Sequence, residues 1–519
     1  MSQSKSQKKP KKRCRPRRGE IKNKTRKKRD AKKKLRKQQQ AKGLVPPLHF
    51  WPSNAKSRLE TPKEELEARE SFTTDQIRLL KQLLPGLLKD LSMIPDFRNP
   101  KKLKHRLTML MAYGILMFVY QMCSRREANT TMTKPIFKEN MKRIIPEFED
   151  MPHHDTLKRL LEGIDDVGDI ENALCSMIKS LIAKKKFQRY LVGGKYMIAI
   201  DGTQKMVRED LLSPEWLERH VGKKENEEGK TQYYVYVLEA NLVFRNGISI
   251  PLMSEFLEYE KGDKDRSKQD CEQRAFHRLA PRLKALFPRL PIMMLLDGLY
   301  PNGPIIEACA RKHHWDFMIV LQDDSLPSVW EEFRGLNKLQ KDNILEWTWG
   351  NRRQRFTWVN EIEYAYGPNE RKRLTLHVVV CEESWEEVNE KGKIVTKTSR
   401  HAWISAKPIT VHNVHARCNL GGRHRWGIES SFLVEKHHGY SYEHCFSYDW
   451  DAMRGYHYLM RIGHALNTLI LNSTLMIERG RHMGLRGIIG FLRETMSVLL
   501  LTSENVIALL ARPCQLRLE

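Results

Sequence analysis

The sequence lacks the features that mark secreted, disulfide-stabilised or membrane-spanning proteins. Its nine cysteines are scattered and no two form a CxxC pair, which argues against a disulfide framework and favours a reducing compartment. No apolar signal segment follows the basic start. The apolar run of residues 107–123 is at the short limit for a bilayer span and contains Thr108, Gly114 and Gln121. We therefore expect a buried helix there, no membrane partner and a cytoplasmic protein.

Acidic residues are scarce at the start of the chain. Residues 1–42 carry 21 lysines and arginines against only Glu20 and Asp30, a net charge of +19. The whole chain carries +28, so the remaining 477 residues carry +9 (28 − 19). Because residues 1–42 are almost devoid of apolar side chains, we expect a disordered basic tail. A nuclear address or inconsequential polyanion binding would also explain it, but a non-specific grip on DNA fits best.

The rest of the chain changes pattern several times. Amphipathic helices come first; they suit a DNA-binding domain, although a generic helical bundle explains them equally well. Three strands, a helix, a strand, a helix and a strand then predict a mixed α/β sheet with helices packed on its faces. The predicted segments are a tail (1–42), a helical N-terminal domain (43–190), the first part of an α/β core (191–330), a β-rich insertion (331–415), the completion of the core (416–475) and a C-terminal helical region (476–519).

Two Asp-Gly pairs each close a buried apolar run. Asp201 ends the run YMIAID, and Asp297 ends PIMMLLD. Taken singly, each pair is typical of a turn. In the predicted strand order, however, the two strands can be neighbours, which would bring both carboxylates to one edge of the sheet.

A third carboxylate lies in the stretch RWGIESSFLVEK, residues 425–436. On a helix, Arg425 and Glu429 are four residues apart and share a face, to which Lys436 returns after almost two turns. Alone this is also the pattern of a solvated surface helix. Packed over the strand edge, Glu429 could complete a carboxylate triad with the two aspartates. Oxygen ligands of this kind suit Mg²⁺ or Mn²⁺, and two such ions can drive phosphoryl transfer. Arg425 and Lys436 would then bind DNA phosphates.

These motifs resemble the DDE transposases with a ribonuclease-H-like core, in the branch related to the IS4 group of insertion sequences. The resemblance runs from about residue 94 to residue 471 and rests on AIDGTQ, LLDGLY and an R-(3)-E-(6)-K signature. It implies Asp201, Asp297 and Glu429 as catalytic metal ligands, a β-rich insertion before the glutamate, and metal-dependent cutting and joining of DNA ends. It also implies a homodimer on DNA and a nucleoid-associated location. The family usually has tyrosine where this chain has Gly422.

Other patterns compete with this interpretation. Asp323-Asp324 and Asp263/Asp265 are further acidic pairs, and the histidines and cysteines of residues 412–445 could suggest zinc, although they lack the regular paired spacing of structural sites. Trp347, Trp349 and Trp358 lie beside arginines, which suits either base stacking or plain sheet packing. Three functions stay open: an active transposase, a metal nuclease or domesticated recombinase on the same core, and a non-catalytic DNA-binding protein.

Overall fold

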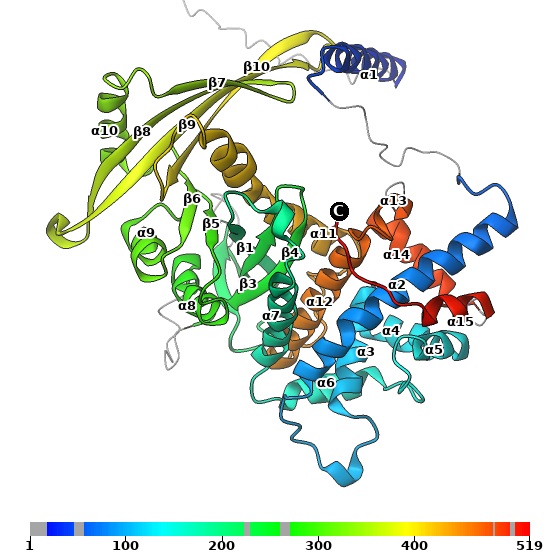
Figure 1. The fold of residues 1–519 in the computed structure, drawn as a ribbon. Coiled ribbons are helices and arrows are strands. Elements are labelled where there is room, and N and C mark those ends of the chain that lie inside the picture. The colour runs from blue at the N-terminus through cyan, green and yellow to red at the C-terminus, as the bar shows by residue number, and fades with distance from the viewer. Residues whose placement is uncertain (1–17, 46–56, 223–228, 260–269, 481–482, 499–503) are drawn as a thin grey trace, which may run out of the picture.

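The computed structural model describes six stretches of the chain, residues 18–45, 57–222, 229–259, 270–480, 483–498 and 504–519 (Figure 1). The helices are α1 (Arg18–Ala41), α2 (Pro62–Leu91), α3 (Leu107–Val119), α4 (Arg125–Met132), α5 (Pro135–Lys142), α6 (His154–Gly163), α7 (Gly168–Ala183), α8 (Glu272–Leu286), α9 (Gly303–Glu307), α10 (Pro327–Asn337), α11 (Trp426–His437), α12 (Trp450–Leu471), α13 (Ile477–Gly480), α14 (Gly484–Thr495) and α15 (Glu504–Ala511). The strands are β1 (Tyr196–Arg208), β2 (Leu217–Val221), β3 (Lys230–Val243), β4 (Ser249–Phe256), β5 (Ile292–Leu296), β6 (Asp316–Val320), β7 (Ile344–Trp349), β8 (Arg352–Tyr366), β9 (Lys372–Val388) and β10 (Ile394–Ser405).

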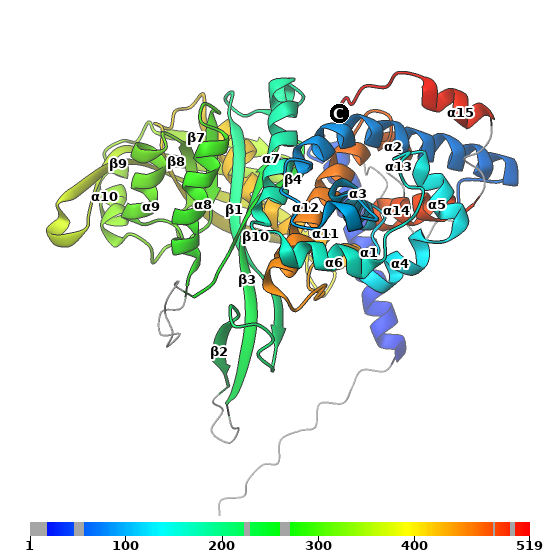
Figure 2. The same ribbon diagram turned by 90° about the horizontal axis from the view of Figure 1, so that it is seen from below.

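One mixed sheet contains all of these strands. Its order is β2-β3-β1-β5-β6-β10-β9-β8-β7, and β4 pairs with β3. The pairs of β1 with β3 and of β3 with β4 are antiparallel, whereas β1, β5 and β6 run parallel. Figure 2 shows β1 and β3 between α8 and α9 on one side and α11 and α12 on the other. The predicted mixed α/β fold is therefore confirmed, but four strands and not three precede the β-α units, because β2 adds to the edge of β3.

The β-rich stretch before residue 415 prolongs the same sheet. β10 pairs antiparallel with β6, with Ile404 opposite Ile319. β9, β8 and β7 then add outward as long antiparallel hairpins. The expectation of β structure here is confirmed, and its ladder is continuous with the core.

A helical body packs around α12, whose residues are almost all buried. Its closest neighbour is α3, the apolar run, which is buried as predicted. A β-carbon at Gly463 of α12 would lie 2.7 Å from the Phe118 side chain of α3, so the backbone of α12 packs directly against that side chain. The C-terminal helices α14 and α15 pack on α2, and Phe491 contacts Phe72 edge-to-face. No helix in the part of the chain described here is long and apolar enough to cross a membrane.

The expected disordered tail needs a correction over residues 18–41, which form α1. Lysine, arginine, glutamine and alanine all favour helix, and no proline interrupts the segment. The prediction of disorder from composition was therefore wrong for this segment, which is stabilised as a helix by packing against β9. Residues 1–17, and the acidic pair Asp263/Asp265, lie outside the described residues.

Candidate active site

Asp201 lies on β1, and Asp297 directly follows β5, the parallel neighbour of β1, so the expected adjacency of these two strands is confirmed. The last β1–β5 pair joins Ala199 to Leu295, a difference of 96 in residue number (295 − 199). Asp201 and Asp297 differ by the same 96 (297 − 201), so each lies two residues beyond that pair. The two carboxylates therefore stand at one edge, where the parallel ladder ends.

The Asp-Gly pair at Asp201 is not a turn. β1 continues beyond it to Arg208 because it stays paired with the long strand β3, with Asp201 opposite Glu239. Gly202 serves close packing instead, since a β-carbon there would lie 2.5 Å from the carboxyl carbon of Glu272. Asp297, by contrast, directly follows β5, and its Oδ1 accepts a hydrogen bond from the Leu299 amide at 2.9 Å.

Helix α11 brings the third carboxylate to this edge through Arg425. Nη2 of Arg425 donates to Glu429 Oε1 at 2.7 Å, and Nη1 donates to Asp201 Oδ2 at 3.4 Å. The guanidinium is buried and bridges the two carboxylates. Arg425 itself ends a short 3₁₀ turn, Gly422–Arg425, rather than lying inside the helix. The predicted sharing of a face by Arg425 and Glu429 is confirmed.

Lys436 returns to the same neighbourhood but is already engaged. Its Nζ donates to the Gln204 carbonyl oxygen at 3.0 Å and lies 3.2 Å from Glu443 Oε1. Gln204 belongs to β1, three residues after Asp201. Lys436 therefore ties the end of α11 to the strand that carries the first carboxylate.

The electrostatics of Asp201 show that acidic groups converge here. Burial raises its pKa from 3.8 to about 7, with further increases from Asp297, Glu429 and Glu272, against the lowering effect of Arg425. Glu272, at the start of α8, accepts hydrogen bonds from Tyr236 at 2.7 Å and from another tyrosine hydroxyl at 3.0 Å. Sequence reasoning missed this fourth acidic residue because it opens an ordinary amphipathic helix.

The three predicted ligands fit a hard divalent cation by donor type. All are carboxylates, and the crowding that raises the pKa of Asp201 is what a bound cation would relieve. Their oxygens do not all lie within 4.8 Å of one another, since the described residues contain one such group and it is elsewhere. Arg425 stands between Asp201 and Glu429, so a cation bridging them would have to displace its guanidinium.

A cavity of about 420 Å³ opens beside Asp297. Arg400, Arg423 and Arg425 give its wall positive charge, and Trp426, which is 59% exposed, adds an aromatic surface. Such a lining suits a phosphate backbone passing the carboxylates.

The three tryptophans of the insertion differ in whether their surroundings suit sheet packing or base stacking. Trp358 is buried in the sheet, as packing predicts, whereas Trp347 is 43% exposed. Trp349 holds a cation, since Arg423 Cζ lies 5.2 Å from its ring centroid and 5.8 Å from that of Trp403.

Gly422 leaves no room for the tyrosine that is usual at this position in the family that the sequence resembles. A β-carbon at Gly422 would lie 2.8 Å from Nε1 of Trp403 on β10. The indole therefore occupies the space that a side chain at residue 422 would enter. The same indole lines the cavity beside Asp297, so an aromatic group is supplied here from a different strand.

A buried network of charged side chains from α12 and β3 anchors the inner face of α11. Arg461 of α12 lies 3.1 Å from Glu435 Oε1 and 3.2 Å from Glu239 Oε2. Burial alone would raise the pKa of Glu239, but Arg461 and His457 lower it to about 2. His464 Nδ1 lies 2.7 Å from Glu435 Oε1. Because Glu435 is six residues after Glu429, this network fixes the helix that presents the third carboxylate.

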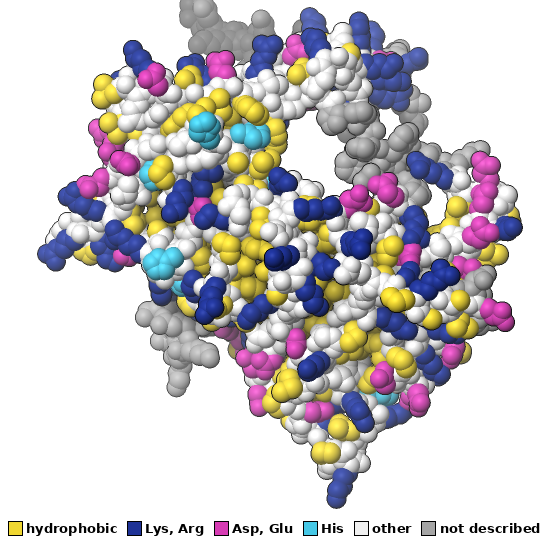
Figure 3. Space-filling view, viewed as in Figure 1, with side chains coloured by type: hydrophobic (Ala, Val, Ile, Leu, Met, Phe, Trp, Pro, Cys, Tyr) yellow, Lys and Arg dark blue, Asp and Glu magenta, His cyan; other side chains and the backbone are white. Residues whose placement is uncertain are grey.

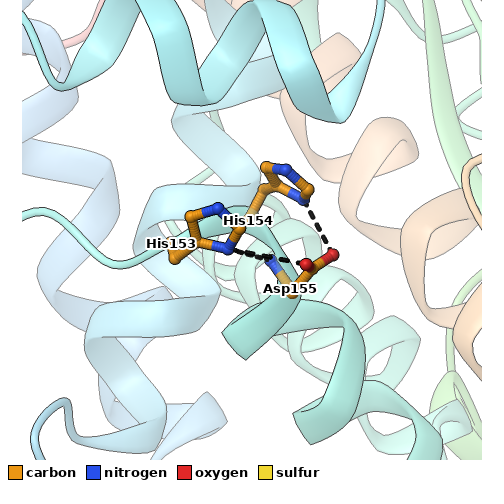
Figure 4. Close-up of side chains that lie close together, drawn as sticks. All are labelled: His153, His154 and Asp155. Carbon is orange, nitrogen blue, oxygen red and sulfur yellow. Dashed lines mark hydrogen bonds and ion pairs between the residues drawn. The ribbon is translucent and has the colours of Figure 1, made fainter.

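The competing acidic and histidine clusters do not form comparable sites. Asp323 is 81% exposed and pairs with Arg400. Within residues 412–445, no three histidine, cysteine or acidic side chains bring ligand atoms within 4.8 Å of one another. The one group that does is His153, His154 and Asp155 at the start of α6 (Figure 4). There His153 caps the helix and Arg125 lies 3.1 Å from the Asp155 carboxylate, so the group already has structural partners.

Comparisons with known proteins gave one family match, over part of the chain. Residues 88–178, from the end of α2 into α7, match the family model described as DDE_Tnp_1-associated. No curated protein matches the chain. Among solved structures, the chain is similar to the piggyBac transposase synaptic complex with hairpin DNA, determined by cryo-EM, at 13% identity and a TM-score of 0.33 over 87% of this chain and 82% of that one. The family match supports a DDE-type transposase.

Proposed function

We propose that this chain is the transposase of an insertion sequence related to the IS4 group, with a ribonuclease-H-like core that cuts and joins DNA ends. The observation that carries the proposal is that Asp201 and Asp297 each lie two residues beyond the last pair of the adjacent parallel strands β1 and β5, with Glu429 linked to Asp201 through Arg425. A homodimer would bring two DNA ends together, and the protein would act where DNA lies, at the nucleoid.

Each residue has a distinct part in the proposed reaction. Asp201, Asp297 and Glu429 would hold two ions of Mg²⁺ or Mn²⁺, which supply the two-metal chemistry that activates the attacking oxygen and stabilises the leaving oxygen. Arg425, which bridges Asp201 and Glu429 in this structure, would be available to bind a DNA phosphate in bidentate fashion when these carboxylates hold a cation. Lys436 keeps α11 against β1 and adds positive charge beside the phosphates.

The test is cleavage and joining of the DNA that borders the protein's own gene, with Mg²⁺ present. Asp201→Asn and Glu429→Gln should abolish cleavage while leaving DNA binding in a gel-shift assay nearly unchanged. The matched control is Asp324→Asn, which alters an exposed aspartate and should cleave normally. Unchanged cleavage by either site variant would overturn the assignment, and cut ends without joined products would favour a nuclease.

A further inference from the structure

Helix α1 has one face held against the insertion. Leu35 and Gln39 are buried, and Lys28 and Ala31 are half-buried. Spacings of three and four residues place these side chains on one side of the helix. That side meets β9 and the turn that follows it, where a β-carbon at Gly392 would lie 3.8 Å from the backbone nitrogen of Lys28. The helix is therefore docked.

The opposite face of α1 is a row of cations. At about 100° per residue, Arg26, Arg29, Lys33 and Lys37 lie across the helix from Leu35. All four are exposed. The one acidic residue among them, Asp30, lies 3.9 Å from Arg26, and both side chains are more than half exposed, so this pair neutralises little of the charge.

Because α1 is docked on the insertion, its positive charges are held at one fixed place on the protein. Residues 18–41 contain twelve lysines and arginines and two acidic residues, a net charge of +10. Figure 3 shows lysine and arginine side chains crowded where this helix lies, at the outer end of the insertion. The cations of such a row repel one another, and a polyanion that lies along the row removes this unfavourable electrostatic energy.

We propose that the docked α1 is a binding surface for the phosphate backbone of duplex DNA, set apart from the active-site cavity. From Arg26 to Lys37 the row covers twelve residues, a rise of about 16 Å along a straight helix. A rigid row of this length suits the regular phosphates of a duplex. Residues 18–41 contain no aromatic residue, so the surface lacks the stacking groups that bind unpaired bases. The proposal rests on the proposed function only for DNA being the polymer.

The test measures binding of the full chain, in EDTA, to a random-sequence 40-base-pair duplex and to a single strand of equal length. The test variant changes Arg26, Arg29, Lys33 and Lys37 to glutamine. The control variant makes the same change at Lys312, Arg334, Lys338 and Lys341, four exposed cations near α9 and α10. The test variant should flatten the dependence of log Kd on log salt by about 3 to 4 for the duplex, from roughly 0.9 per phosphate contact. The control should keep the wild-type slope.

A second variant separates a docked surface from a loose basic tail. Leu35→Ser keeps every charge but removes the buried anchor, and it should weaken duplex binding roughly three- to tenfold through lost preorganisation. Equal slopes for the test and control variants, wild-type affinity of Leu35→Ser, or an equal loss for single-stranded DNA would each overturn the proposal. Because EDTA blocks cleavage, failure here is distinct from failure of the Asp201→Asn cleavage test, which addresses the proposed function.

Discussion

Replacing Asp201 with asparagine should stabilise the fold in a pH-dependent way. The folded-state pKa of about 7, against an ordinary 3.8, means that the folded chain holds this proton more tightly than the unfolded chain does. The stability it contributes is therefore complete at low pH and is lost as the pH rises from about 4 to about 7. The pKa difference corresponds to roughly 4 kcal/mol at most. Because this pKa already includes the attraction of Arg425, we expect Asp201→Asn to gain up to about 4 kcal/mol of stability at pH 8.

The assay is urea unfolding of wild type and Asp201→Asn from pH 4 to pH 8, without divalent ions. The two free energies of unfolding should coincide near pH 4 and diverge above it, while the exposed-site control Asp324→Asn should follow wild type. Saturating Mn²⁺ at pH 8 should stabilise wild type by mass action and leave Asp201→Asn nearly unchanged. A pH-independent difference between the two proteins would refute the raised pKa of Asp201, and equal Mn²⁺ stabilisation would refute the role of Asp201 as a ligand.

Two further substitutions test the scaffold around the site. Gly422→Tyr should lower the free energy of unfolding by about 1–3 kcal/mol because its side chain meets Trp403; in a Trp403→Gly background the same change should cost much less in the same urea titration. Arg461→Met should cost about 3–5 kcal/mol because it leaves Glu239 and Glu435 buried without their partner. A loss below 1 kcal/mol in that titration would mean that the network does not hold α11.

Much of the site could be predicted from the chain because its signals are local. Buried runs that end in Asp201 and Asp297 have the length and apolar content of interior strands, and β-α order makes them neighbours. The Arg425–Glu429 contact follows from helical spacing alone. The predicted domain boundaries, and the roles of all five site residues, stay predictions.

What escaped sequence reasoning depends on contacts between distant segments. Glu272 and Glu239 come near the site only once α8 and β3 have packed, and nothing in their own neighbourhoods marks them. Glu435 did carry a signal, because six residues after Glu429 is about 240° around the helix, which turns it toward the interior. Helix α1 was not predicted, because a highly charged segment of low hydrophobicity is expected to be disordered unless another surface covers the one apolar stripe of the helix.

Because β10 pairs with β6, the insertion is a rigid extension of the core sheet and not a hinged lid. A continuous ladder from β1 to β7 resists bending within its plane, so the outer hairpins and the docked α1 keep a set distance from the carboxylates. Each residue added to or removed from both β9 and β10, whose connecting turn meets α1, changes that reach by about 3.3 Å, and steps of two residues preserve which face each side chain occupies. Related chains could thus evolve different spans of contacted DNA by lengthening one hairpin, with the chemistry left untouched.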